Sequence, residues 1–312
     1  MQVPDSLTNA LTYIGAATTC YIGSRIARHV YCYTRPSSLP RYNPPGKEAW
    51  ALVTGATDGI GFGFAQTLSK HGFNVFLHGR SREKLLQRQQ ELQNEFPDVK
   101  TKLIVYDVAN ISENVDSIAR EIGDAHLTVL INNVGGNIVQ LGRFPEMSYA
   151  EVRDTITLNA TFMTQLTRLL IPILEKNGPS LVMNISSVAA YGMQYVGIYS
   201  ATKGYTNSFS SALDAEMKAD GRGIEVLGIA VGNTQSQSND IAVSFFNPSA
   251  RRLAEGALSR VGCGRHLVWG YWPHFLQGLS IDFLPRAILL RTITSNMKAL
   301  RHQWAARETK QK

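Results

Sequence analysis

The sequence predicts an α/β fold, in which helices cover both faces of a doubly wound parallel sheet. Short apolar segments rich in β-branched residues alternate along the chain with longer segments that have the period of a helix. This alternation is typical of a parallel sheet whose strands are buried on both faces. The first strand begins near residue 51 and leads through a glycine-rich turn into a helical pattern. The 312 residues suffice for one large domain with extensions.

The glycine-rich turn lies within residues 51–63, which read ALVTGATDGIGFG. Gly55, Gly59 and Gly61 have the spacing Gly-x-x-x-Gly-x-Gly, and a helical pattern follows. Glycine lets the backbone turn tightly and approach a ligand closely, and the free N–H groups at the start of a helix favour an anion. The turn is therefore a candidate site for the pyrophosphate of a dinucleotide. A merely tight strand–helix turn is the alternative.

The later elements follow in the same alternating order. Apolar runs predict strands at 74–78, 102–106, 128–132, 180–185 and 225–231. Helical spacing of apolar residues predicts helices at 81–96, 149–176 and 199–219, and Ser81 is a suitable cap for the first of these. An apolar stripe at helical spacing within 269–290 is interpreted as a lid over a substrate site, with membrane contact as the alternative.

The N-terminal region resembles a membrane-associated segment. Residues 6–24 contain no charged side chain, and four arginines follow between positions 25 and 41. The stretch is long enough to cross a bilayer, but its six serines and threonines leave an anchor and an amphipathic surface helix equally open. A cleaved signal peptide is disfavoured because Asp5, and no basic residue, precedes the stretch. The prolines at 36, 40, 44 and 45 predict a linker without helix.

The net charge of +7 is concentrated at the two ends of the chain. Residues 1–48 hold five Lys/Arg and two Asp/Glu, and residues 286–312 hold seven and one. Basic ends on a nearly neutral domain suit an anionic membrane surface better than a nucleic acid. Cys20, Cys32 and Cys263 show no metal-binding spacing, so we interpret them as reduced thiols and predict no metal site.

Two side chains suited to proton transfer lie in the motif YSATK. Tyr199 and Lys203 are four residues apart and share one face of the helix predicted there. A tyrosine hydroxyl ionises near pH ~10, so it exchanges protons near neutrality only where a neighbouring cation stabilises the phenolate. Ser186 and Ser187 end a predicted strand about a dozen residues upstream, where a hydroxyl is able to hold a carbonyl oxygen. Two unrelated surface residues are the alternative to a tyrosine–lysine pair.

Five motifs in this order resemble the short-chain dehydrogenase/reductase family over residues 50–236. They are TGATDGIG, NNVG at 132–135, Asn159, ISS at 185–187 and YSATK at 199–203. The resemblance implies that Tyr199 donates a proton, that Lys203 lowers its pKa and contacts a ribose, and that Asn159 supports a proton relay. It also implies that Ser187 binds the carbonyl. Because Ser187 lies 12 residues before Tyr199 where 13 is usual in the family, Ser186 stays open for that role.

The resemblance also implies the cofactor, NADP(H). Members that choose NAD have an acidic residue at the end of the second strand, where this chain has Gly79 followed by Arg80, and a guanidinium there suits the extra phosphate of NADP. Asp107 matches the adenine-contacting aspartate, and Asn133 lines the adenosine side. The family's Pro-Gly after the sixth strand is absent, since Val231 and Gly232 precede Ser236. The expected cofactor-binding residues are Gly55, Thr57, Asp58, Gly59, Ile60, Gly61, Arg80, Asp107, Asn133, Tyr199, Lys203, Val231 and Ser236.

The whole layout is most similar to microsomal 3-oxoacyl-CoA reductases and 17β-hydroxysteroid dehydrogenases. This similarity implies NADPH-dependent reduction of a ketone on a lipophilic substrate such as a 3-oxoacyl-CoA, at the cytosolic face of the endoplasmic reticulum membrane. A steroid or specialised-metabolite ketone is the alternative substrate, and a catalytically silent nucleotide-binding scaffold is the alternative class. We expect a membrane-associated segment and linker at 1–48, a Rossmann-type catalytic core at 49–236, and a lid with a basic tail at 237–312. Whether the protein forms a homo-oligomer is left open, and no nucleic-acid partner is expected.

Overall fold

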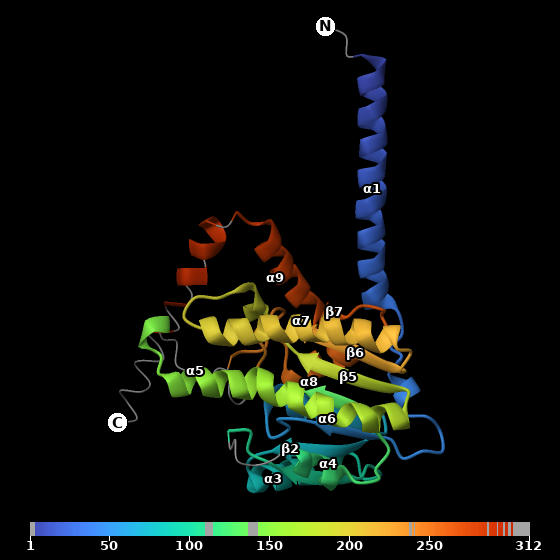
Figure 1. The fold of residues 1–312 in the computed structure, drawn as a ribbon, viewed down its shortest axis with the longest axis vertical. Coiled ribbons are helices and arrows are strands. Elements are labelled where there is room, and N and C mark those ends of the chain that lie inside the picture. Colours follow the sequence, from blue (N-terminus) through green and yellow to red (C-terminus); the bar gives the residue numbers. More distant parts are fainter. Residues whose placement is uncertain are drawn as a thin grey trace.

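A seven-stranded sheet forms the centre of the molecule (Figure 1). Its strand order is β3-β2-β1-β4-β5-β6-β7, and every neighbouring pair is parallel. The strands are β1 (Trp50–Val53), β2 (Asn74–Gly79), β3 (Thr101–Val105), β4 (Leu127–Asn132), β5 (Ser180–Ile185), β6 (Ile224–Ala230) and β7 (Leu267–Trp269). The order reverses between β1 and β4, and ligands of such sheets bind at the carboxyl ends of the strands beside this reversal.

The computed structural model describes residues 4–109, 115–136, 143–236, 239, 241–285, 287–291, 293–295, 297–298 and 301. The helices are α1 (Asp5–Thr34), α2 (Gly59–Lys70), α3 (Arg82–Glu95), α4 (Asp116–Ile122), α5 (Tyr149–Ile156), α6 (Phe162–Asn177), α7 (Gly197–Ala219), α8 (Ala250–Leu258) and α9 (Trp272–Phe283). Most of the basic C-terminal region therefore lies outside the described residues.

Helices cover both faces of the sheet, as the sequence predicts. One apolar core joins α2, α3 and α8 to the sheet, and a second joins α4, α6 and α7 to the opposite face. Successive residues of β1 alternate between the two cores: Ala51 and Val53 belong to the first, Trp50 and Leu52 to the second. Strands buried on both faces explain the continuous apolar runs in the sequence.

The elements predicted from the sequence are confirmed to within a few residues at each end, with four differences. The expected helix 149–176 contains a π-helical segment, Thr157–Thr161, between α5 and α6. The sequence reasoning did not predict α4, α8 or β7, because α4 has 7 residues, α8 has 9 and β7 has 3, too few to show a clear period. The apolar stripe within 269–290 is confirmed as helical over α9.

The helix α1 projects away from the domain (Figure 1). Every residue from 4 to 28 is exposed, including Leu11, Ile14 and Ile26. Among the described helices none combines the length and apolar character that crossing a membrane requires. The first contacts with the domain come from the last turns of the helix, where His29 stacks on Phe275 with ring centroids 3.7 Å apart.

The segment expected to be a proline-rich linker packs into the core instead. The side chains of Leu39 and Tyr42 are each 1% exposed, and the Tyr42 hydroxyl donates a hydrogen bond of 2.6 Å to the Glu225 carboxylate. The expectation that this segment has no helix is also wrong for one 3-10 turn, Leu39–Tyr42, because proline is tolerated in the first turn of a helix. The structure has Cys20, Cys32 and Cys263 as free thiols, and the thiols of Cys32 and Cys263 are hydrogen-bonded to each other.

Two truncations are expected to separate the exposed part of α1 from the buried segment. Removing residues 1–24 deletes no described residue that is buried, so the melting temperature should change by no more than about 2 °C. Removing residues 1–42 also deletes two large buried side chains, Leu39 and Tyr42, each worth roughly 1.5–3 kcal/mol, so the domain should melt well below the intact protein or fail to fold. Thermal unfolding followed by circular dichroism measures both, and equal melting temperatures would show that the buried segment is dispensable.

Candidate active site

The turn between β1 and α2 is held against the end of β4 by hydrogen bonds. The Thr54 hydroxyl donates to the Ile131 carbonyl at 3.1 Å and accepts from the backbone N–H groups of Asn133 and Val134 at 2.8 and 3.0 Å. In return, the Asn133 amide donates to the carbonyls of Thr54 and Gly55 at 3.0 and 3.3 Å. Asn133 thus fixes the glycine turn at the reversal of strand order.

The space around the glycines of this turn is too small for a side chain. A Cβ added to Gly61 would lie 2.1 Å from the Gly55 carbonyl oxygen, and one added to Gly59 would lie 3.0 Å from Cβ of Ser236. Gly55 and Gly59 also have φ angles of 66° and 54°, which side chains disfavour. Because α2 begins at Gly59, its N-terminal N–H groups lie in the turn together with Asp58 and Ile60. These residues fit the pyrophosphate of a nucleotide cofactor.

The end of β2 lies next to the same turn. A Cβ on Gly79 would lie 2.7 Å from Cγ2 of Thr57, and the next residue, Arg80, is exposed. Asp107 follows β3, the neighbour of β2, and its carboxylate accepts a hydrogen bond of 3.1 Å from the N–H of Ala109. The structure therefore gathers Thr57 and Arg80 at one site, with Asp107 on the adjacent strand end.

Ser187 and Tyr199 face each other at the carboxyl end of the sheet. Tyr199 lies in the first turn of α7, and Ser187 follows β5. Burial of the hydroxyl raises the pKa of Tyr199, and a hydrogen bond from the Ser187 side chain acts in the opposite direction. Burial sets the direction of this overall shift, and the expectation that Lys203 lowers the pKa of Tyr199 stays a prediction. The Lys203 ammonium lies 5.7 Å from the centroid of the Tyr199 ring.

Lys203 is itself a buried cation. Its side chain is 5% exposed, and its Nζ donates a hydrogen bond of 2.8 Å to the carbonyl of Ile185. Burial lowers the pKa of Lys203 to about 8. A Cβ on Gly135 would lie 3.3 Å from Lys203 Nζ and 2.7 Å from Oδ1 of Asn159, so these two side chains flank the same glycine.

Asn159 lies in the π-helical segment between α5 and α6. Its side chain accepts from the N–H of Gly136 and donates to the carbonyl of Gly136, both at 2.9 Å. The Asn159 amide thereby holds the chain that leaves β4, next to Lys203. Single π-helical turns inside α-helices are frequently found at functional sites.

The two serines have different surroundings. The Ser186 hydroxyl is buried and donates to the Lys203 carbonyl at 3.1 Å, so it ties β5 to α7. Ser187 is half-buried, is hydrogen-bonded to Tyr199 and lines a cavity. The loop between Ser187 and α7 is one residue shorter than usual in the resemblance noted above, and it turns with positive φ angles at Gly192 (86°) and Tyr195 (65°). The geometry thus favours Ser187 as the serine beside Tyr199.

The sequence reasoning missed His274, which holds the chain after β6 in place. Its Nδ1 accepts a hydrogen bond of 3.0 Å from the N–H of Gly232, and its Nε2 lies 3.1 Å from the carbonyls of Asn233 and Phe246. This pattern requires a neutral ring with the proton on Nε2, and burial lowers the pKa of His274 accordingly. His274 therefore connects α9 to the segment that follows β6 and begins at Val231. The signal in the sequence was a histidine within the apolar stripe.

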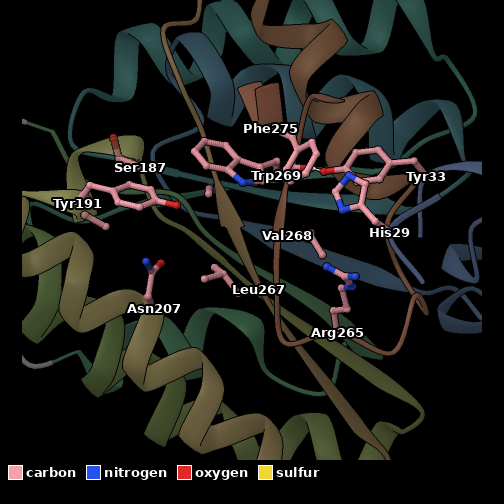
Figure 2. Close-up of a pocket in the computed structure, with 12 residues that line it drawn as sticks. His29, Tyr33, Ser187, Tyr191, Asn207, Arg265, Leu267, Val268, Trp269 and Phe275 are labelled. Carbon is pink, nitrogen blue, oxygen red and sulfur yellow. Dashed lines mark hydrogen bonds between the residues drawn. The ribbon is translucent and has the colours of Figure 1, made fainter. Parts of the chain in front are cut away.

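A cavity of about 220 Å³ opens beside Ser187 (Figure 2). It is enclosed by residues of the Ser187 loop, α7, β6, β7, α9 and the end of α1. Its lining residues are His29, Tyr33, Ser187, Ala190, Tyr191, Asn207, Ala230, Arg265, Leu267, Val268, Trp269 and Phe275. Most of this wall is apolar, which suits a lipophilic substrate.

The doubly wound fold, the glycine turn and the serine–tyrosine–lysine cluster together define a nucleotide-dependent oxidoreductase. Residues 49–243 match the model of the family described as short chain dehydrogenase, and the chain belongs to this family. It is an oxidoreductase that acts on CH–OH groups.

Similar proteins include very-long-chain 3-oxoacyl-CoA reductases. That of Anas platyrhynchos is 31% identical over 277 residues, which cover 86% of each chain, and that of Homo sapiens is 29% identical over 307 residues, or 96% of each. Putative steroid dehydrogenase 1 of Caenorhabditis elegans is 28% identical over 313 residues, 96% of this chain and 97% of the other.

Solved structures share the fold. A short-chain dehydrogenase from Sphingobium yanoikuyae in complex with NADPH is 25% identical, with a TM-score of 0.61, and the match covers 77% of this chain and 97% of that one. A 7β-hydroxysteroid dehydrogenase is 17% identical, with a TM-score of 0.71, and the match covers 83% of this chain and 99% of that one. The predicted fold class and family are therefore confirmed.

Proposed function

We propose that the protein reduces a ketone on a lipophilic acyl chain, most specifically a 3-oxoacyl-CoA, to the alcohol with NADPH as cofactor. The observation that carries this proposal is the hydrogen-bonded pair of Ser187 and Tyr199 beside buried Lys203, with Ser187 in the wall of an apolar cavity. The names of the relatives and the NADPH in the Sphingobium yanoikuyae structure support the substrate and the cofactor.

Four side chains at or near the cavity wall divide the proton chemistry between them. The glycine turn and Arg80 would hold NADPH, which would supply the hydride. The Ser187 hydroxyl donates a hydrogen bond to the ketone oxygen and positions it beside Tyr199. Tyr199 gives its proton to the oxygen as negative charge develops there, and its raised pKa keeps it protonated at neutral pH. General acid catalysis of this kind contributes typically ~100- to 10,000-fold.

Lys203 and Asn159 support the proton donor. The Lys203 ammonium faces the Tyr199 ring and stabilises the phenolate that forms when the proton leaves. Asn159 fixes Gly136 and flanks Gly135 together with Lys203, which suits a relay that returns a proton to Tyr199. These roles assign the catalytic set to Asn159, Ser187, Tyr199 and Lys203, and leave Ser186 a structural role.

A steroid or specialised-metabolite ketone is the second candidate substrate, supported by the steroid dehydrogenase names among the relatives. Reduction assays with a panel of 3-oxoacyl-CoA esters, steroid ketones and polyketide-like ketones separate the candidates by kcat/KM. The proposal expects kcat/KM for the 3-oxoacyl-CoA esters to be at least about tenfold higher than for the other ketones. A catalytically silent scaffold would consume NADPH with none of them, and the intact Tyr199–Lys203 pair argues against it.

The Arg80 guanidinium is expected to select NADPH over NADH. It is exposed at the end of β2 beside Thr57, and a charge-assisted hydrogen bond to the extra phosphate is worth roughly 1.5–3 kcal/mol. Arg80→Ala should therefore raise the Kd for NADPH at least about tenfold and leave that for NADH nearly unchanged. Fluorescence titration with both cofactors measures this, with Arg120→Ala on the exposed side of α4 as control. Equal loss for both cofactors would show that Arg80 acts only on the local structure.

We also propose attachment to the cytosolic face of the endoplasmic reticulum membrane. The exposed apolar residues of α1 supply one contact, and Phe245, Trp272 and Phe283 supply a second (53%, 49% and 82% exposed). Figure 1 shows α1 and α9 projecting from the same end of the domain, so one membrane surface reaches both. Arginines on α1 favour an anionic leaflet.

Fractionation of cells that express the intact protein and the variant without residues 1–24 tests this attachment. The intact protein should sediment with membranes at low salt, and the shortened variant should be released in part by high salt or alkaline carbonate, because two weak contacts hold what one does not. An intact protein in the soluble fraction at low salt would contradict the proposed attachment.

A further inference from the structure

The cavity beside Ser187 carries polar groups in a definite order (Figure 2). Ser187 and Tyr191 lie at one side, and His29, Tyr33 and Arg265 lie at the other. Between these two ends the wall is formed mainly by β7 and α9, with Leu267, Val268, Trp269 and Phe275. An elongated molecule whose reacting end lies at Ser187 therefore meets apolar side chains first and a guanidinium group last.

The far end of the cavity is cationic. Among the described residues no carboxylate forms an ion pair with Arg265, Arg260 or Arg35. Arg260 donates to the Cys32 carbonyl at 3.0 Å and Arg35 to the Val261 carbonyl at 3.4 Å, and these acceptors are neutral. The Glu225 carboxylate accepts from the Tyr42 hydroxyl and from the N–H of Gly262. Of these three arginines Arg265 lines the cavity, and its positive charge is therefore available to an anion.

Asn207 adds an acceptor along the cavity. Its side chain belongs to α7 and lines the same cavity, and its Oδ1 is buried with no hydrogen-bond partner among the described residues. Leaving a buried amide oxygen unpaired is unfavourable, so such an atom indicates a ligand that brings a donor. The apolar neighbours Ala230 and Leu267 offer no donor of their own.

We propose that this cavity binds the phosphopantetheine arm of a thioester carrier. After the thioester the arm has two amides separated by short aliphatic stretches, then a branched, hydroxylated segment and a phosphate. The cavity follows Ser187 with the Asn207 oxygen, an apolar wall and the Arg265 guanidinium. An amide N–H donates to Asn207 Oδ1, and Arg265 binds the phosphate, with His29 beside it. The inference rests on the proposed function for the position of the reacting ketone. It adds that the rest of the carrier extends from the site past Arg265.

Binding of carrier fragments tests the assignment without turnover. The probes are coenzyme A, 4′-phosphopantetheine and pantetheine, each titrated calorimetrically into the intact protein in the presence of NADP. Arg265→Gln should weaken the two phosphorylated probes at least about tenfold and leave pantetheine unchanged, since a hydrogen bond to a charged group is lost. Arg265→Lys should restore part of the affinity. Asn207→Leu should weaken all three probes, and the exposed Arg120→Gln should weaken none.

The outcomes separate this inference from the proposed function. Failure of the intact protein to bind coenzyme A, or equal binding by Arg265→Gln, would overturn the inference even if 3-oxoacyl-CoA is reduced. Binding of coenzyme A that depends on Arg265, without reduction of any 3-oxoacyl-CoA, would overturn the proposed function alone. Vesicles of phosphatidylcholine with phosphatidylserine test the other source of a phosphate. If Arg265→Gln impairs only vesicle binding, the guanidinium serves a lipid headgroup and the carrier assignment is wrong.

Discussion

Replacing Tyr199 by phenylalanine is expected to lower kcat for ketone reduction by at least about a hundredfold while NADPH still binds. The substitution removes one hydroxyl, the proton donor, and the lost general acid catalysis sets the magnitude. The ring keeps its place against Lys203, so the fold and the nucleotide site are unaffected. Steady-state kinetics with a saturating ketone, together with a fluorescence titration of NADPH, measures both quantities.

Tyr205→Phe is a matched control for Tyr199→Phe. Tyr205 lies on the same helix, 43% exposed, and its hydroxyl is hydrogen-bonded to that of Thr164 rather than to Ser187. This control should retain normal turnover. In the reverse direction Tyr199 must first lose its proton, and since burial raises its pKa, alcohol oxidation should accelerate as the pH rises. Near-normal reduction by Tyr199→Phe would show that another group donates the proton.

Gly61→Ala is expected to weaken NADPH binding by about 5- to 150-fold. The added Cβ would lie 2.1 Å from the Gly55 carbonyl oxygen and 2.6 Å from Nδ2 of Asn133, both closer than side-chain atoms tolerate. Overpacking of this kind costs about 1–3 kcal/mol, and the upper value corresponds to a factor of about 150 in affinity. The turn must open to relieve the clash, which displaces the N–H groups that bind the pyrophosphate.

Gly204→Ala shows whether any glycine-to-alanine change disturbs the protein. Gly204 lies on α7, and a Cβ there meets nothing within 4 Å, so this variant should bind NADPH normally and unfold at an equal or higher temperature. Thermal unfolding of both variants separates a lost nucleotide site from a lost fold. A folded Gly61→Ala protein with unchanged NADPH affinity would contradict the assignment of this turn to the cofactor.

Local patterns in the sequence predicted the parts of the site that lie within single strand–helix units. The turn with Gly59 and Gly61 shows a fixed spacing, and Tyr199 and Lys203 occur one helical turn apart. The order of the apolar runs predicted six of the seven strands. In each case the physical cause is local: backbone space in the turn, side-chain direction on a helix, and two-sided burial of a parallel strand.

The rest depends on contacts between residues far apart in the chain, which no local pattern reveals. Ser186 and Ser187 were indistinguishable in sequence, and only the packing of β5 against α7 gives them separate partners. The core position of Tyr42 depends on Glu225, 183 residues away. His274 follows α8 in the sequence, yet it is fixed by Gly232 and Phe246, which precede that helix. The burial that raises the pKa of Tyr199 was also not predicted, because spacing alone does not show how deeply a hydroxyl is buried.

Transfer of deuterium from NADPH labelled at C4 of the nicotinamide tests the central claim most directly. The protein is incubated with the labelled cofactor and a long-chain 3-oxoacyl-CoA, and the product is analysed by mass spectrometry and proton NMR. The proposed function predicts a 3-hydroxyacyl-CoA with one deuterium on C3, formed by the intact protein and at least about a hundredfold more slowly by Tyr199→Phe. No deuterated alcohol from a folded protein that binds NADPH, or equal rates for the two proteins, would contradict it.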